Sequence, residues 1–91
     1  MVKFQRITTK DTALYNYMER LMTASFPSEE YRPLEELRNY TDTKTHFYCN
    51  IILHHDTPVG FITYWDFGHF YYVEHFAIDP SLRNGGHGRM S

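Results

Sequence analysis

Residues able to do chemistry gather near the carboxyl end, in the segment Tyr72–Gly88, which reads YVEHFAIDPSLRNGGHG. Three glycines, Gly85, Gly86 and Gly88, follow a predicted strand there. Because glycine has no side chain, backbone N–H groups at these positions can approach a ligand closely, and such donors at a helix start bind anions. Arg83 adds a permanent, forked positive charge at the rim. The pattern predicts a phosphate-binding loop.

Two familiar phosphate loops do not fit this segment. A P-loop ends in Gly-Lys-Ser/Thr, and no lysine lies near these glycines. A dinucleotide fingerprint needs Gly-x-Gly-x-x-Gly, but Ser91 stands where the last glycine would be if the motif began at Gly86. The alternative left open is that the glycines form an ordinary flexible tail.

The composition is that of one folded domain. The chain has 91 residues, of which 18% are aromatic and 22% are charged. Its formal net charge of −2 leaves no basic excess to bind phosphate backbones, so nucleic acid is not an expected partner. No apolar run is long enough for a membrane span, so no membrane association is expected. The single cysteine, Cys49, excludes an internal disulfide and predicts a cytoplasmic location.

Hydrophobic periodicity predicts the element order β-α-α-β-β-β. Leu14, Met18 and Leu21 share one helical face in the first helix. The later strands carry large apolar groups on both faces, so both faces need cover, which two helices do not readily supply. His54-His55-Asp56 is interpreted as the start of a turn, and no metal site is expected. The predicted ranges are strands at 2–8, 46–54, 59–66 and 70–78, and helices at 11–26 and from 33 to about 41.

The arrangement Arg83-x-x-Gly86-x-Gly88, directly after a strand, resembles the acetyl-CoA signature of the GNAT superfamily of N-acetyltransferases. The element order before it and the segment Phe26–Glu30 between the helices are also similar to that family. The resemblance covers essentially the whole chain but only the first half of the family fold. It implies an α/β (α+β) fold with a mainly antiparallel sheet, and a single incomplete domain over 1–91 that is truncated at the start of the pyrophosphate-loop helix.

The resemblance implies acetyl transfer from acetyl-CoA to a primary amine by direct attack, with no covalent enzyme intermediate. Phe76, Ala77 and Ile78 would lie along the pantetheine arm. The pyrophosphate would be held by the loop residues Arg83, Asn84, Gly85, Gly86, His87 and Gly88.

Glu74 is the candidate general base for that reaction. It precedes Phe76 by two residues and Ile78 by four, so strand alternation predicts that all three share a face. A carboxylate among apolar groups would be desolvated and its pKa raised, which suits a base. Tyr72, on the same predicted face, is the alternative occupant of the site. His75 is expected to face away and to be structural.

The acceptor amine stays open, as an amine-bearing small molecule or a protein N-terminus. Glu29 and Glu30, in the loop between the helices, are expected to attract a cationic acceptor. The 91-residue chain alone is expected to be inactive or weakly active. The alternative is a non-catalytic remnant that binds CoA or a protein partner. The apolar sheet face and open edge predict self-association or strand pairing with another chain.

Overall fold

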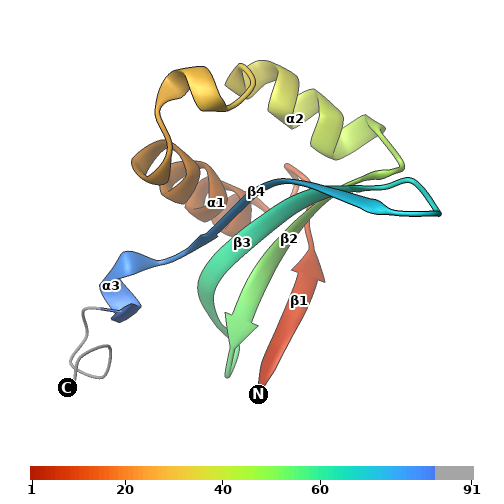
Figure 1. The fold of residues 1–91 in the computed structure, drawn as a ribbon. Helices are drawn as coiled ribbons and strands as arrows, with labels where there is room; N and C mark the ends of the chain where they lie inside the picture. Colours follow the sequence, from red (N-terminus) through yellow and green to blue (C-terminus); the bar gives the residue numbers. More distant parts are fainter. Residues whose placement is uncertain (84–91) are drawn as a thin grey trace.

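The computed structural model describes residues 1–83 and has one antiparallel sheet in the order β1-β2-β3-β4 (Figure 1). This confirms the predicted fold class and the order β-α-α-β-β-β. The elements are β1 (Val2–Arg6), α1 (Thr12–Ser25), the 3₁₀ turn η1 (Ser28–Glu30), α2 (Leu34–Thr43), β2 (Phe47–His54), β3 (Thr57–Asp66), β4 (Tyr71–Ile78) and α3 (Pro80–Arg83).

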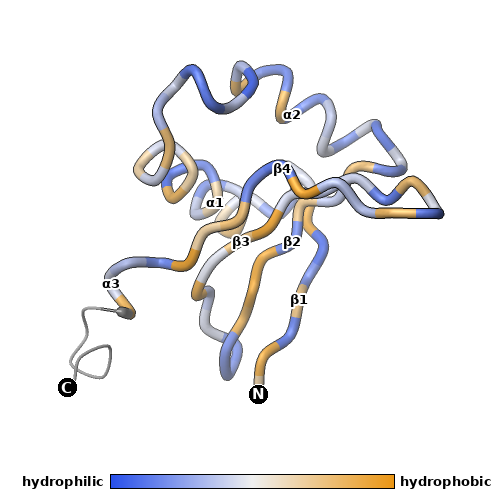
Figure 2. Tube along the Cα trace, viewed as in Figure 1, coloured by the Kyte–Doolittle hydropathy of each residue, from blue (hydrophilic) through white to orange (hydrophobic). Residues whose placement is uncertain are grey.

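Prolines bound the segment between the two long helices. Helix α1 ends before Pro27, and Phe26 already has extended backbone dihedrals, because the residue before a proline is disfavoured in a helix. Pro33 is the N-cap of α2 and has the φ of −49° that its ring imposes. Between these prolines the chain makes the single turn η1. Figure 2 shows this connection as hydrophilic.

The core lies between the two helices and one face of the sheet. Alternate residues of β2, among them Phe47, Cys49 and Ile51, are buried on this face, as is Phe61 of β3. Both helices lie on this side of the sheet in Figure 1. The buried helix residues recur at three- and four-residue spacing, as expected for one face of a helix, and in α1 they are Tyr15, Met18, Leu21 and Met22.

The other face of the sheet has no helix over it in the described part of the chain. Phe4, Val73 and Phe76 lie on this open face, and each is at least half exposed. The structure therefore agrees with the expectation that two helices leave one apolar face uncovered. Arg6 stacks on this face over the ring of Tyr48, with 3.8 Å between the guanidinium carbon and the ring centroid.

Strand β4 contains a β-bulge at Glu74. Thr63 pairs with His75 while Tyr64 pairs with Val73, so Glu74 is an extra residue without a partner on β3. The extra residue interrupts the alternation of side chains. The prediction that Glu74 shares a face with Phe76 and Ile78 was therefore wrong. Phe76 pairs with Ile62 on the open face, whereas the Glu74 side chain reaches Trp65 and Arg32 on the helix side.

Among residues 1–83, no helix is both long enough and apolar enough to cross a membrane.

Candidate functional site

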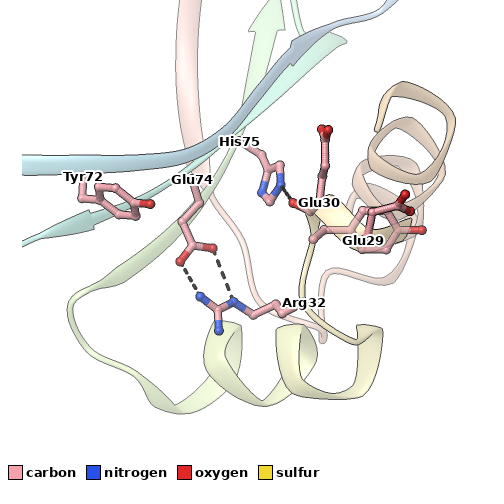
Figure 3. Close-up of a pocket in the computed structure, with 7 residues that line it drawn as sticks. Glu29, Glu30, Arg32, Tyr72, Glu74 and His75 are labelled. Atoms are coloured by element: carbon pink, nitrogen blue, oxygen red, sulfur yellow. Dashed lines mark hydrogen bonds and ion pairs between the residues drawn. The ribbon is translucent and has the colours of Figure 1, made fainter. Parts of the chain in front are cut away.

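An open pocket of about 350 Å³ lies where β4 faces the connection between α1 and α2 (Figure 3). We call it the loop pocket. It brings together both candidate catalytic residues and both candidate substrate-binding residues from the sequence analysis. Its lining residues are Glu29, Glu30, Tyr31, Arg32, Tyr72, Glu74 and His75.

The carboxylate of Glu74 is held by three donors. Arg32 donates to both of its oxygens, through Nε and Nη2, and the indole Nε1 of Trp65 donates to Oε2 at 2.8 Å. The Glu74 side chain is only 12% exposed. Its surroundings are therefore polar and charged, where the sequence had predicted an apolar strand face.

Arg32 is fixed from several sides. Its Nη1 donates to Glu36 at 2.7 Å, an i,i+4 ion pair across the start of α2. Its guanidinium also lies over the ring of Tyr40, 4.5 Å from the centroid. Burial alone would lower the pKa of Arg32, but hydrogen bonds to Glu74 and Glu36 raise it overall. Sequence reasoning missed Arg32, and only its four-residue spacing to Glu36 could have drawn attention to it.

His75 lines the loop pocket, although strand alternation had predicted that it faces away from Glu74. The bulge turns both side chains to the helix side. The Nε2 atom of His75 lies 2.7 Å from the backbone carbonyl oxygen of Glu30. The Phe26 ring packs edge-on against the imidazole, with 4.8 Å between centroids. In Figure 3 the imidazole stands between the Glu74 carboxylate and Glu30.

The other predicted residues of this site are more exposed. Glu29 and Glu30 both have exposed side chains, and Glu30 contributes its carbonyl to the contact with His75. Tyr72 is 57% exposed and lines the pocket from the start of β4. Within residues 1–83, no group of three His, Cys, Asp or Glu side chains is placed to hold a metal ion.

A second pocket, of about 390 Å³, lies along the outer edge of β4, and we call it the edge pocket. It contains the three strand residues that the sequence analysis assigned to the cofactor. The end of α1 forms its opposite wall. Its lining residues are Ala24, Ser25, Phe26, Phe76, Ala77, Ile78 and Pro80.

Within residues 1–83, the backbone of β4 offers unpaired groups to this pocket. The N–H of Asp79 donates to the carbonyl of Val59 on β3 at 2.8 Å. Because successive residues of a strand direct their N–H and C=O groups to opposite sides, those of Phe76 and Ile78 point away from β3. In the described chain β4 is an edge strand, so these groups face a free edge.

The chain leaves this edge through Asp79. Its carboxylate accepts hydrogen bonds from the hydroxyl and N–H of Ser81 and from the Tyr17 hydroxyl, which keep the pKa of Asp79 below its ordinary value. Arg83 is the last residue of α3. The predicted loop residues Asn84, Gly85, Gly86, His87 and Gly88 lie outside the described residues.

A family profile described as the acetyltransferase (GNAT) family matches residues 12–91. The chain belongs to this family. Among solved structures, it is similar to an acetyltransferase assigned to the GNAT family from Bacteroides thetaiotaomicron, with 62% identity and a TM-score of 0.89. That match covers 94% of this chain and 49% of the other, so the chain spans about half the length of this GNAT relative. No curated protein sequence matches significantly.

Proposed function

We propose that this GNAT protein takes part in transferring an acetyl group from acetyl-CoA to a primary amine, by direct attack of the amine on the thioester. The observation that carries the proposal is the position of β4 between two pockets. One pocket borders its free backbone edge, and the other contains ionisable side chains from the same strand.

The edge pocket fits the pantetheine arm. Pantetheine contains two amide groups, which can pair with a free strand edge as an added strand does. Phe76, Ala77 and Ile78 supply apolar lining and outward-facing backbone groups there. Arg83 and the following residues Asn84–Gly88 would hold the pyrophosphate, as the sequence motif predicts.

The loop pocket suits the acceptor amine. Carboxylates of Glu29, Glu30 and Glu74 line it, and their negative charge favours a cationic amine on a small molecule or a protein N-terminus. The ammonium must lose a proton before it can attack. Two side chains in the pocket can accept that proton, namely Glu74, the candidate from the sequence, and His75. Tyr72 lies beside them as a further catalytic candidate.

Catalysis by the 91-residue chain itself is expected to be weak, because the chain corresponds to about half of its structural neighbour. The description of residues 1–91 as one incomplete domain stays a prediction, as does the cytoplasmic location. We therefore expect binding of acetyl-CoA and an amine at these two pockets to be easier to detect than turnover.

A second candidate function is self-association without catalysis. The observation that favours it is the open face of the sheet, where Phe4, Val73 and Phe76 are each at least half exposed. Phe4 lies on one edge strand of the sheet and Val73 and Phe76 lie on the other, so apolar side chains are exposed at both edges of this face, and exposed apolar surface is typical of an interface.

The test incubates the 91-residue chain with acetyl-CoA and a panel of primary amines, and detects the acetylated amine by mass spectrometry. We expect a slow, enzyme-dependent product and measurable CoA binding by calorimetry. Gly86→Glu should abolish CoA binding, because it places bulk and negative charge where the pyrophosphate is expected. Unchanged CoA affinity in Gly86→Glu would rule out the predicted loop, and absence of both binding and product would rule out the proposed function.

A further inference from the structure

The contact between His75 and Glu30 determines which ring nitrogen of the histidine is protonated. A backbone carbonyl oxygen can only accept a hydrogen bond, so the Nε2 atom that lies 2.7 Å from it must carry the proton. A neutral imidazole has one protonated nitrogen, which leaves Nδ1 with a free lone pair. The edge-on contact with Phe26 holds the ring in place. The loop pocket therefore contains an oriented imidazole whose Nδ1 atom can accept a proton.

The other proton-acceptor candidate, Glu74, is engaged differently. Its two oxygens already accept three hydrogen bonds, two from Arg32 and one from Trp65. Protonating this carboxylate would remove the negative partner of Arg32 within a pair that is only 12% and 24% exposed. The Glu74–Arg32 pair is thus a fixed structural contact that positions β4 against the start of α2.

We propose that Nδ1 of His75, and not the carboxylate of Glu74, accepts the proton of the acceptor ammonium, an inference that rests on the proposed acetyl transfer. Nδ1 takes one proton from the ammonium. The neutral amine nitrogen then forms the C–N bond to the acetyl carbonyl carbon, and the C–S bond breaks. The second proton on that nitrogen passes to the leaving thiolate, giving the amide and CoA thiol, and Nδ1 returns its proton to solvent.

The charges around His75 are compatible with the imidazolium that forms in this step. The carboxylates of Glu29, Glu30 and Glu74 line the same pocket as the ring. The positive charge of Arg32 in that pocket is paired with two carboxylates. From the C-cap of α1, the contact is the uncharged ring of Phe26, and the remaining titratable groups of the pocket are the phenols of Tyr31 and Tyr72.

A kinetic test compares His75→Gln with wild type on two acceptors, a strongly basic alkylamine and a weakly basic amine that is already neutral at the assay pH. Glutamine can still donate to the Glu30 carbonyl, so the loop contact is retained. We expect kcat/KM for the alkylamine to fall by about 10²- to 10⁴-fold, the usual contribution of a general base. The loss should be at least tenfold smaller for the weakly basic amine, which needs no such deprotonation.

The matched control is His69→Gln, which changes an exposed histidine in the β3–β4 turn and should leave both rates unchanged. Equal losses on the two amines in His75→Gln would show a structural role and overturn the inference, while acetyl transfer by wild type still stands. Absence of both turnover and CoA binding in wild type would instead overturn the proposed function and this role with it.

A second measurement does not depend on turnover. Nitrogen-15 NMR of the imidazole at pH 8, with His75→Gln identifying the His75 resonances, should show a protonated Nε2 and an unprotonated Nδ1. A predominant Nδ1–H tautomer would overturn the inference whatever the activity of the chain.

Discussion

The position of the Glu74 side chain depends on a single extra residue in β4 and on its contact with Arg32, which lies 42 positions earlier in the chain. Arg32 links the bulged strand to α2 through its pairs with Glu74 and Glu36. Trp65 completes the contact from β3 and packs against the core residue Phe47, with 5.1 Å between ring centroids. A residue first considered for catalysis thus also ties three elements together.

Removing Arg32 should therefore reduce stability as well as change the site. We expect Arg32→Met to lower the free energy of unfolding by about 1–3 kcal/mol, because it leaves a mostly buried carboxylate without its charged donor. Adding Glu74→Gln should recover part of that loss, since no unpaired charge remains. Urea unfolding of both single variants and the double variant measures the coupling.

The matched control is Lys3→Met, which removes the cation from an exposed pair with Asp56. An exposed pair contributes little, so this change should cost less than about 1 kcal/mol. An Arg32→Met variant no less stable than Lys3→Met would contradict the structural role of the Glu74–Arg32 pair.

Asp79 predicts a pH dependence of stability. Hydrogen bonds from Ser81, and then from Tyr17, hold the pKa of Asp79 below its unfolded value. A lowered folded pKa contributes stability above the unfolded value of about 4, and that contribution is lost as the pH falls through the folded pKa. Wild type should therefore be more stable than Asp79→Asn at pH 7, and the difference should shrink between about pH 4 and pH 2. A pH-independent difference in urea unfolding would be inconsistent with this effect.

At the scale of elements, β4 is the strand that organises the site. Its outer edge borders the edge pocket, and its helix-side residues line the loop pocket. Strand periodicity, turn residues and prolines were sufficient to predict the element order and most boundaries. Hydrophobic periodicity assigns side chains to the faces of a sheet only where the alternation is unbroken, so it could not predict the bulge at Glu74. The placement of Glu74 and His75 was wrong for this reason.

Gly60 holds β4 close to β3. A Cβ atom at this position would lie 2.4 Å from the carbonyl oxygen of Ala77, far inside contact distance. We expect Gly60→Ala to displace β4, to lower the free energy of unfolding by about 1–3 kcal/mol and to weaken CoA binding through the displaced edge. Thermal unfolding and calorimetry with CoA measure the two effects.

Gly68→Ala is the control for Gly60→Ala. Gly68 has a positive φ of 88° in the β3–β4 turn, and nothing lies within 4 Å of its added Cβ. Gly68→Ala should lower stability through backbone strain but leave CoA affinity unchanged, because the turn is remote from the edge pocket. Equal CoA affinities in wild type and Gly60→Ala would argue against a donor site along β4.

At the scale of the whole molecule, one apolar face of the sheet is not covered by any helix of the described chain. Sequence reasoning predicted it, since the strands are apolar on both faces and only two helices are available. It could not predict Arg32 or the pairing of Glu74, because contacts between residues far apart in sequence leave no periodic pattern. The glycines of the predicted phosphate loop lie outside the described residues and stay a prediction from the motif.

The open face predicts concentration-dependent self-association. Replacing Phe4 and Val73 with serine removes apolar surface from two strands of that face and should shift sedimentation toward the monomer. Phe70→Ser, at an equally exposed position between β3 and β4, should not have this effect. A wild-type chain that sediments as a monomer at all concentrations would exclude self-association through the open face.

The most direct test of the central claim is a titration of the isotope-labelled chain with acetyl-CoA, followed through its backbone amide NMR signals. We predict that the largest saturable shifts occur at Phe76 and Ile78, whose N–H groups face the free edge of β4, with smaller shifts at α1 residues of the edge pocket. Saturable binding that leaves these two amides unshifted would contradict a donor site along this strand.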